Sequence, residues 1–268
     1  METTYVHGYT ARETRRLADQ ADTLAALLHD GTAYPAGSKV LEAGCGVGAQ
    51  TVHLVTRSPG AHLTSIDISA ESLALARARV AATAPDARVE WHQADLLRPP
   101  FPDASFDHLF VCFVLEHLPD PHGALLRLKR LLRPGGGITV IEGDHGSAIY
   151  HPRSDHAQAT IDCLIRMQAT AGGDALIGRR LHPLLSEAGF GDVVVEPRTV
   201  YADRSRPSLV DGFTRNTFIA MVESAREASI RVGLMSEAEW NQGIADLERT
   251  AEEGTFHYAF FKATALAP

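Results

Sequence analysis

Short apolar runs alternate with amphipathic stretches along the first 140 residues. The runs predict strands at 39–43, 63–68, 88–92, 106–111 and 138–141. Apolar residues at helical spacing predict helices over 10–29, after Gly48, from Ser69 to about Thr83, and over 121–132. Parallel strands need crossover connections, and helices supply them. The pattern therefore predicts an α/β protein with a parallel sheet covered by helices on both faces.

The second half of the chain has a different sequence pattern. This pattern predicts helices over 154–171 and 178–188, a strand over 192–201, a mostly helical block over 207–253 and an aromatic-rich strand over 255–265. We expect an N-terminal helical lid at 1–36 and one domain at 37–268. Helical additions to that domain are expected at about 151–188 and 205–253.

Composition narrows the classes of partner. The 268 residues carry 25 Lys and Arg against 33 Asp and Glu, and the resulting net charge of −8 repels phosphate backbones and anionic lipid. The apolar run Leu109–Leu115 is far shorter than the roughly 18 residues that span a bilayer. We therefore expect no nucleic-acid or membrane partner. The polar N-terminus and three scattered cysteines favour the cytoplasm.

A glycine-rich turn and two acidic residues form the clearest chemical pattern. Gly44, Gly46 and Gly48 follow the first strand, where glycine lets the backbone adopt unusual φ values and approach a ligand closely. Asp67 ends the second strand, where a carboxylate can accept hydrogen bonds from both ribose hydroxyls. Asp95 follows the third strand, where a carboxylate can accept from an adenine amino group.

With these residues the chain resembles the class I S-adenosylmethionine-dependent methyltransferases, in particular the small-molecule branch of the ubiquinone and menaquinone type. Five ordered pieces between about Lys39 and Glu142 carry the resemblance: Leu41–Gly48, Ile66–Ser69, Ala94–Leu96, Phe106–Asp107 with Leu115–Leu118, and Leu132–Gly136. The resemblance implies a Rossmann-like, seven-stranded, mostly parallel sheet flanked by helices, with an antiparallel final strand. It also implies S-adenosylmethionine as cofactor and S-adenosylhomocysteine as product.

The resemblance also assigns cofactor contacts. It implies that Glu42, Gly44 and Gly46 line the methionine part of the cofactor. Ribose and adenine would lie against Asp67, Ile68, Asp95 and Leu96, and the backbone around Cys112 and Phe113 would close the pocket. Related small-molecule methyltransferases often fold an N-terminal segment over the cofactor, and Tyr9 is the first contact expected from it.

Two other functions remain as alternatives. An NAD-dependent oxidoreductase also uses a glycine turn followed by an acid, but here the third glycine comes one residue too early for the G-x-G-x-x-G form. A noncatalytic protein that binds S-adenosylmethionine or S-adenosylhomocysteine would have the same cofactor motifs.

Candidate catalytic residues follow the fourth and fifth strands. His145 is the first candidate base, with Asp144 beside it, and His117 is the second, because a neutral His suits proton removal near pH 7. For Glu116 and His117 we favour a structural role, in which they cap or orient the following helix. No spacing indicates a metal site.

The expected reaction is methyl transfer to an O, N or C nucleophile of a small organic acceptor. An Ala- and Arg-rich, Lys-poor composition is compatible with a high-GC bacterium and natural-product biosynthesis. The sequence decides neither the acceptor nor the assembly, for which a homodimer is an option.

Overall fold

The computed structural model describes residue 21 and residues 23–268. The chain divides into two compact units. The sheet unit contains Ala25–Glu142, Ile177–Pro197 and Phe261–Pro268. The helical unit contains the described residues up to Leu24 together with Gly143–Leu176 and Arg198–Phe260. We describe each unit by itself.

The sheet unit is built on five parallel strands. They are β1 (Lys39–Ala43), β2 (His62–Asp67), β3 (Val89–Gln93), β4 (Phe106–Cys112) and β5 (Leu132–Gly143). Their order in the sheet is β3-β2-β1-β4-β5, and β8 (Thr255–Leu266) follows β5. From β1 the chain adds β2 and β3 on one side, and it then adds β4 and β5 on the other side, so the strand order switches between β1 and β4. That switch point is where doubly wound folds bind ligands.

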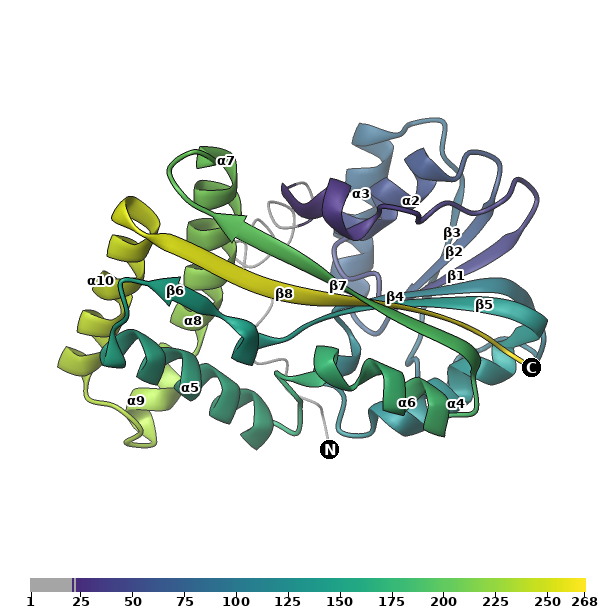
Figure 1. The fold of residues 1–268 in the computed structure, drawn as a ribbon. Helices are drawn as coiled ribbons and strands as arrows, with labels where there is room; N and C mark the ends of the chain where they lie inside the picture. The colour runs from purple at the N-terminus through teal and green to yellow at the C-terminus, as the bar shows by residue number, and fades with distance from the viewer. Residues whose placement is uncertain (1–20, 22) are drawn as a thin grey trace. The chain divides into compact units, whose positions relative to one another are not determined.

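Helices connect several of these strands (Figure 1). α2 (Ala49–Arg57) follows β1, α3 (Ala70–Thr83) follows β2, and the short turn η1 (Leu115–His117) and α4 (Pro121–Leu131) lie between β4 and β5. The unit also contains the turn η3 (Ile177–Arg180) and α6 (Leu181–Glu187). Local sequence sets their starts. The Ser69 side chain accepts a hydrogen bond from the Ser72 N–H at the start of α3, and Asp120 accepts one from Gly123 at the start of α4.

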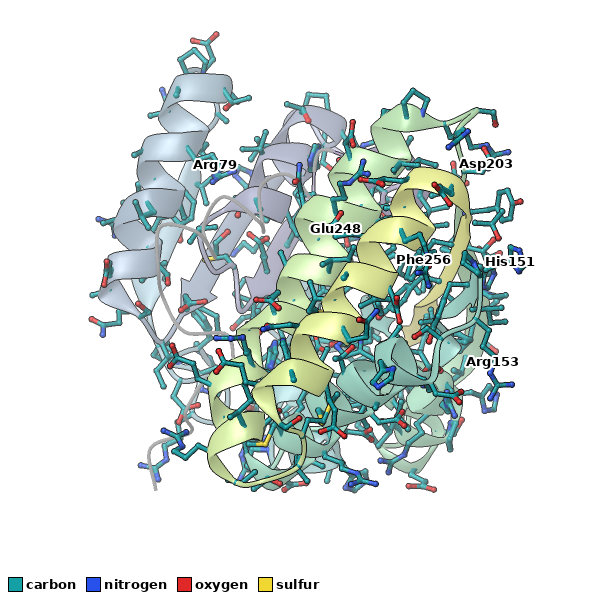
Figure 2. The ribbon with its side chains drawn as sticks, turned by 90° about the vertical axis from the view of Figure 1, so that its left-hand side faces the viewer. Arg79, His151, Arg153, Asp203, Glu248 and Phe256 are labelled. Carbon is teal, nitrogen blue, oxygen red and sulfur yellow. The ribbon has the colours of Figure 1, made fainter. Side chains whose placement is uncertain are left out.

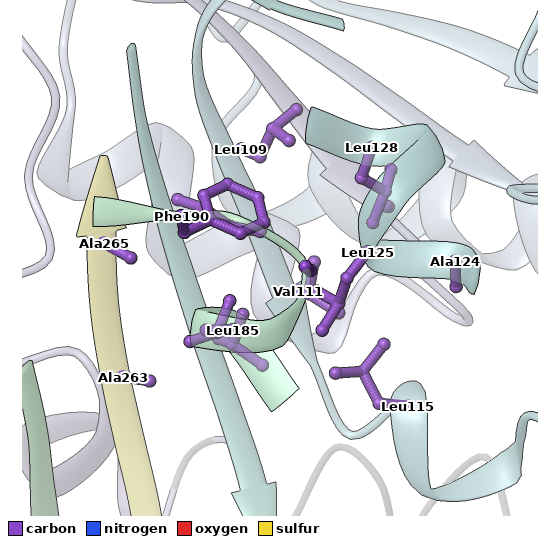
Figure 3. Packing of buried hydrophobic residues seen from close by; sticks show 14 of the residues in the cluster. Leu109, Val111, Leu115, Ala124, Leu125, Leu128, Leu185, Phe190, Ala263 and Ala265 are labelled. Carbon is purple, nitrogen blue, oxygen red and sulfur yellow. The ribbon is translucent and has the colours of Figure 1, made fainter. Parts of the chain in front are cut away.

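Apolar side chains of β4, α4 and α6 form the core of this unit (Figure 3). Leu109, Leu125, Leu128 and Leu185 are wholly buried in it. Small residues of β8 complete the cluster, including Ala263. Strands with helices on both faces are buried on both sides, so their sequences read as continuous apolar runs.

The helical unit contains most of the second half. Its elements are η2 (His145–Ser147), β6 (Ile149–His151), α5 (Asp155–Thr170), α7 (Pro207–Leu209), the π-helix η4 (Val210–Ile219), α8 (Ala220–Ser224), α9 (Arg226–Arg231) and α10 (Glu237–Glu253). Figure 2 shows Glu248 on α10 and Phe256 on the strand that follows. Glu248 pairs with Arg215 of η4 at 3.0 Å, which joins the two helices. No helix in the described chain is both long and apolar enough to cross a membrane.

The structure confirms the α/β class and corrects the strand count. The described residues form eight strands and not seven. The unpredicted strand is β6, whose three residues pair antiparallel with the start of β8 but carry no alternating apolar pattern. β7 (Gly191–Ala202) pairs with β8 as well. Most of the predicted helix over 10–29 lies outside the described residues. In the described part of that range, residues 21 and 23–28 are helical.

β5 also begins earlier than predicted, at Leu132, and α4 ends at Leu131. The glycines after Pro134 extend the strand because they pair with the C-terminus. Gly135 N–H donates to Ala267 O, and Ala267 N–H donates to Gly136 O, each at 2.8 Å. Farther along β5, a Cβ on Gly143 would lie 2.5 Å from the Tyr258 hydroxyl. Residue numbers rise along β5 while those of its β8 neighbours fall, so β8 runs antiparallel to β5, as predicted.

The close approach of α2 to α3 predicts the cost of a side chain at Gly48. Its φ is +75°, and a Cβ there would lie 2.8 Å from the Ala76 Cα. Gly37 has a similar φ of +80° with nothing within 4 Å. We expect Gly48→Ala to destabilise the fold by about 3 kcal/mol and Gly37→Ala by only about 1 kcal/mol, measured by urea unfolding. Equal losses would contradict the contact with Ala76.

Candidate functional site

The glycine-rich turn after β1 is fastened to the end of β2. Gly44 N–H and Cys45 N–H both donate to the carbonyl of Ile66 at 2.9 Å. Gly44, Gly46 and Gly48 all have positive φ, which explains the need for glycine. A Cβ on Gly46 would meet nothing within 4 Å, so there is open space beside the backbone of the half-buried Gly46.

Asp67 joins this turn to the turn after β2. Its Oδ2 accepts a hydrogen bond from Gly46 N–H at 2.8 Å, and its Oδ1 accepts one from Ser69 N–H at 2.9 Å. Burial raises the pKa of Asp67, and these backbone N–H groups act in the opposite direction. A carboxylate can accept about four hydrogen bonds, so both oxygens keep capacity for ligand hydroxyls.

Ile68, Asp95 and Leu96 lie in the turns after β2 and β3. Ile68, directly after Asp67, is 63% exposed and offers an apolar side chain there. Asp95 and Leu96 are half-buried beyond β3. Asp95 Oδ1 accepts a hydrogen bond from Leu97 N–H at 2.8 Å, and Ala94 N–H donates to Asp67 O at 3.0 Å. The turns after β1, β2 and β3 are thus hydrogen-bonded in series.

The turn after β4 reaches the same glycines from the other side. Cys112 is buried, and Phe113 adopts a φ of +56° while its N–H donates to Ile141 O at 2.9 Å. The Val114 side chain lies against Gly44, where an added Cβ would be 2.6 Å from Val114 Cγ2. The predicted residues of the sheet unit therefore lie along one edge of the sheet.

Glu42 lies beneath the glycine turn and is 2% exposed. Its Oε2 accepts hydrogen bonds from the Thr51 and Ser65 hydroxyls, each at 2.7 Å. Burial raises the pKa of Glu42 to about 7, although the two hydroxyl groups act in the opposite direction. The carboxyl group therefore changes its charge near neutral pH.

The second candidate base also belongs to the sheet unit. His117 ends η1, and its Nε2 lies 3.6 Å from Oε1 of Glu116. Glu116 is only 7% exposed, so its carboxyl group is nearly removed from water. This pairing agrees with both predicted roles of His117: it can orient the turn, and it can accept a proton.

The first candidate base, His145, is buried in the helical unit at 3% exposure. Its Nδ1 lies 2.7 Å from the hydroxyl of Tyr258. Asp144, next to it in the chain, caps η2, where its Oδ1 accepts a hydrogen bond from Gly146 N–H at 3.0 Å.

Sequence reasoning missed Tyr258. It lies 113 residues after His145 in an aromatic strand, and its ring packs against Phe213, Phe218 and Phe260. Nothing in that strand distinguishes a Tyr with a polar partner from its apolar neighbours. Only the alternation of β8 opposite the end of β5 could have suggested the pairing.

Two sequence predictions concern Tyr9 and a metal site. Tyr9 lies outside the described residues, so its proposed contact with the cofactor stays a prediction. The described part of the chain holds no group of three or more His, Cys, Asp or Glu side chains that could bind a metal ion.

Known proteins are similar to this chain in sequence and in fold. Residues 41–140 match the family model of the methyltransferase domain. A 27-O-demethylrifamycin SV methyltransferase of Amycolatopsis mediterranei is 32% identical over 134 residues, which cover 50% of this chain and 49% of that protein. A demethylmenaquinone methyltransferase of Clavibacter sepedonicus is 36% identical over 107 residues, or 40% of this chain and 42% of that one.

A solved structure extends the similarity of fold to almost the whole chain. It is the Haemonchus contortus phosphoethanolamine N-methyltransferase 2 with phosphomonomethylethanolamine and S-adenosylhomocysteine, at a TM-score of 0.57 and 18% identity. It matches 92% of this chain and 53% of that one. The chain spans about half the length of the first curated relatives it matches. Residues 41–140 therefore resemble a methyltransferase domain, in agreement with the class that the sequence motifs predict.

The burial of Glu42 predicts a pH dependence of stability. An unfolded Glu ionises near pH 4.5 and buried Glu42 near 7, so the folded protein binds the extra proton between these values. Stability should therefore fall as pH rises through this window. Relative to Glu42→Gln, we expect the wild-type protein to lose about 2.5 kcal/mol of unfolding free energy between pH 5 and pH 8.

The Gln variant is a matched control because its amide oxygen can still accept from Thr51 and Ser65. Urea unfolding at both pH values measures the difference. A gap between the two proteins that is the same at pH 5 and pH 8 would show that Glu42 does not titrate there.

Proposed function

We propose that this protein catalyses S-adenosylmethionine-dependent methyl transfer to an O, N or C nucleophile of a small organic acceptor. The observation that carries the proposal is the Asp67 carboxylate, which bridges the glycine turn and the turn after β2. The named methyltransferases among the relatives support the reaction class.

The described residues fit an adenosyl ligand. Asp67 would accept from the ribose hydroxyls, exposed Ile68 and Leu96 would lie against the adenine, and Asp95 would accept from its amino group. Glu42, Gly44 and Gly46 would line the methionine part, and the backbone around Cys112 and Phe113 would close the pocket. When bound, the cofactor supplies a methyl group already activated on a sulfonium. A partly ionised Glu42 favours such a cation electrostatically.

His145 is the base we propose for a protonated acceptor. When Nδ1–H donates to the Tyr258 hydroxyl, Nε2 is the unprotonated ring nitrogen and can take a proton from the acceptor. Tyr258 would thus select the useful tautomer of the imidazole. His117, beside Glu116, is the second candidate. Positioning of the acceptor supplies the rest of the acceleration.

We also propose a small organic acceptor as the partner and the cytoplasm as the compartment. A net charge of −8 disfavours nucleic acid and anionic lipid, and the relative that acts on a rifamycin supports a small organic acceptor from natural-product biosynthesis. The thiols of Cys45, Cys112 and Cys163 are unpaired and buried, which agrees with the cytoplasm. We retain the lid over residues 1–36, the domain at 37–268 and the homodimer as expectations.

The ribose assignment predicts the effect of Asp67→Ala. Titration calorimetry with S-adenosylhomocysteine should show binding by the wild-type protein, and NAD should give no measurable heat. Loss of the carboxylate should raise Kd at least about tenfold, since each charge-assisted hydrogen bond contributes about 1.5–3 kcal/mol. Asp103→Ala, which breaks only an exposed pair with Arg130, should leave Kd unchanged. Unchanged affinity in Asp67→Ala would refute the assignment.

The base assignment predicts graded losses of rate. Once a mass-spectrometric screen identifies the acceptor, His145→Ala should lower kcat by about 10²–10⁴ while S-adenosylhomocysteine affinity stays within about threefold. Tyr258→Phe should lower kcat by about tenfold and change its pH profile, because the orienting hydrogen bond is lost while the aromatic ring stays. A His145→Ala variant with wild-type kcat from pH 6 to 9 would exclude this base. Failure to methylate any acceptor despite cofactor binding would favour the noncatalytic alternative.

A further inference from the structure

A buried carboxyl group at the end of β5 holds the turn after β4. Glu142 is 0% exposed, and its Oε1 accepts hydrogen bonds from Val114 N–H at 3.0 Å and Leu115 N–H at 2.7 Å. The backbone N–H of Glu116 also contributes to stabilising this carboxyl group. Three consecutive N–H groups at the start of η1 therefore converge on one side chain from a strand 28 residues away.

The turn that Glu142 holds is under conformational strain and touches the glycine turn. Phe113 is a non-glycine residue with a φ of +56°, a region that L-residues rarely adopt. Such a conformation persists only where surrounding contacts impose it. The residue after Phe113, Val114, lies against Gly44, and the N–H of Phe113 donates a hydrogen bond to the carbonyl of Ile141. Release of the Glu142 hydrogen bonds would let Val114 move away from Gly44.

The charges around Glu142 favour its neutral form. Burial raises the pKa of Glu142 well above its ordinary value, and the carboxyl group of Glu116 raises it further. Cys112 and Glu42 face the same region. Burial raises the pKa of the Cys112 thiol as well, and Lys262 lowers it. Oε2 of Glu142 accepts no hydrogen bond from the residues that the structure describes. A glutamine amide has nearly the same shape and presents the same acceptor oxygen.

We propose that Glu142 is a positioning residue whose buried carboxyl group fixes residues 113–116 against the glycine turn and so sets the affinity for the cofactor. The part of this inference that concerns the cofactor rests on the proposed function. Glu142 itself acts through the backbone of the β4 turn and needs no contact with the ligand.

The test compares three variants of the full chain. Glu142→Ala removes the acceptor, Glu142→Gln retains it, and Leu184→Ala removes a buried side chain of comparable size from the α6 core. Calorimetric titration with S-adenosylhomocysteine gives Kd, thermal unfolding gives Tm, and hydrogen exchange followed by NMR gives the protection of the amides of Val114 and Leu115.

We expect Glu142→Ala to raise Kd by at least about tenfold and to lose protection at Val114 and Leu115. Glu142→Gln should stay within about threefold of the wild-type Kd and keep that protection. Leu184→Ala should lower Tm without changing Kd by more than about twofold, because its effect is confined to packing.

Each contrary result has a separate meaning. If the wild-type protein binds S-adenosylhomocysteine and Glu142→Ala binds equally well, Glu142 has no positioning role. If Glu142→Gln is as impaired as Glu142→Ala, the acceptor oxygen is not what holds the turn, and the inference is also overturned. Absence of binding by the wild-type protein would contradict the proposed function, while the exchange data would still decide whether Glu142 holds the turn.

Discussion

The hydrogen bonds that Asp67 accepts from Gly46 and Ser69 hold together the edge on which the proposed chemistry depends. Parallel strands end with backbone groups that have no ladder partner, and buried groups of this kind need a hydrogen bond from elsewhere. Here a side-chain carboxylate supplies it. Because the same carboxylate spans two turns, it fixes the glycine turn relative to the turn after β2. The residues that would contact an adenosyl group are thereby positioned before any ligand binds.

The same arrangement recurs at the end of β5, where Glu142 supports the turn after β4. Glu42 lies between these two sites, with hydroxyl groups as its partners. Three acidic groups are thus held close to the glycine turn, and burial raises the pKa of each. Removal of carboxyl groups from water costs free energy unless they are hydrogen-bonded, stay neutral or face a cation. A sulfonium ligand offers the third possibility, which links the electrostatics of this edge to the proposed cofactor.

The sequence predicts the parts of the structure that local patterns determine. Strand β1, the positive-φ glycines and the position of Asp67 follow from a short apolar run, a glycine turn and an acid at a strand end. Glu142 and Tyr258 act on residues 28 and 113 positions away, and no local pattern encodes such a pairing. Strand β6 was missed because three residues at the edge of β8 need no apolar alternation, and β5 starts early because its glycines pair with the C-terminus.

The central claim is that the turns after β1, β2, β3 and β4 form one adenosyl-binding edge. The most direct test is to titrate ¹⁵N-labelled protein with S-adenosylhomocysteine and follow the backbone amide signals by NMR. The account predicts the largest shifts at Gly46, Ile68, Leu96 and Phe113, with saturation at a single common Kd. Signals at these four amides that stay in place, or shifts confined to the β7 residues 191–202, would contradict it.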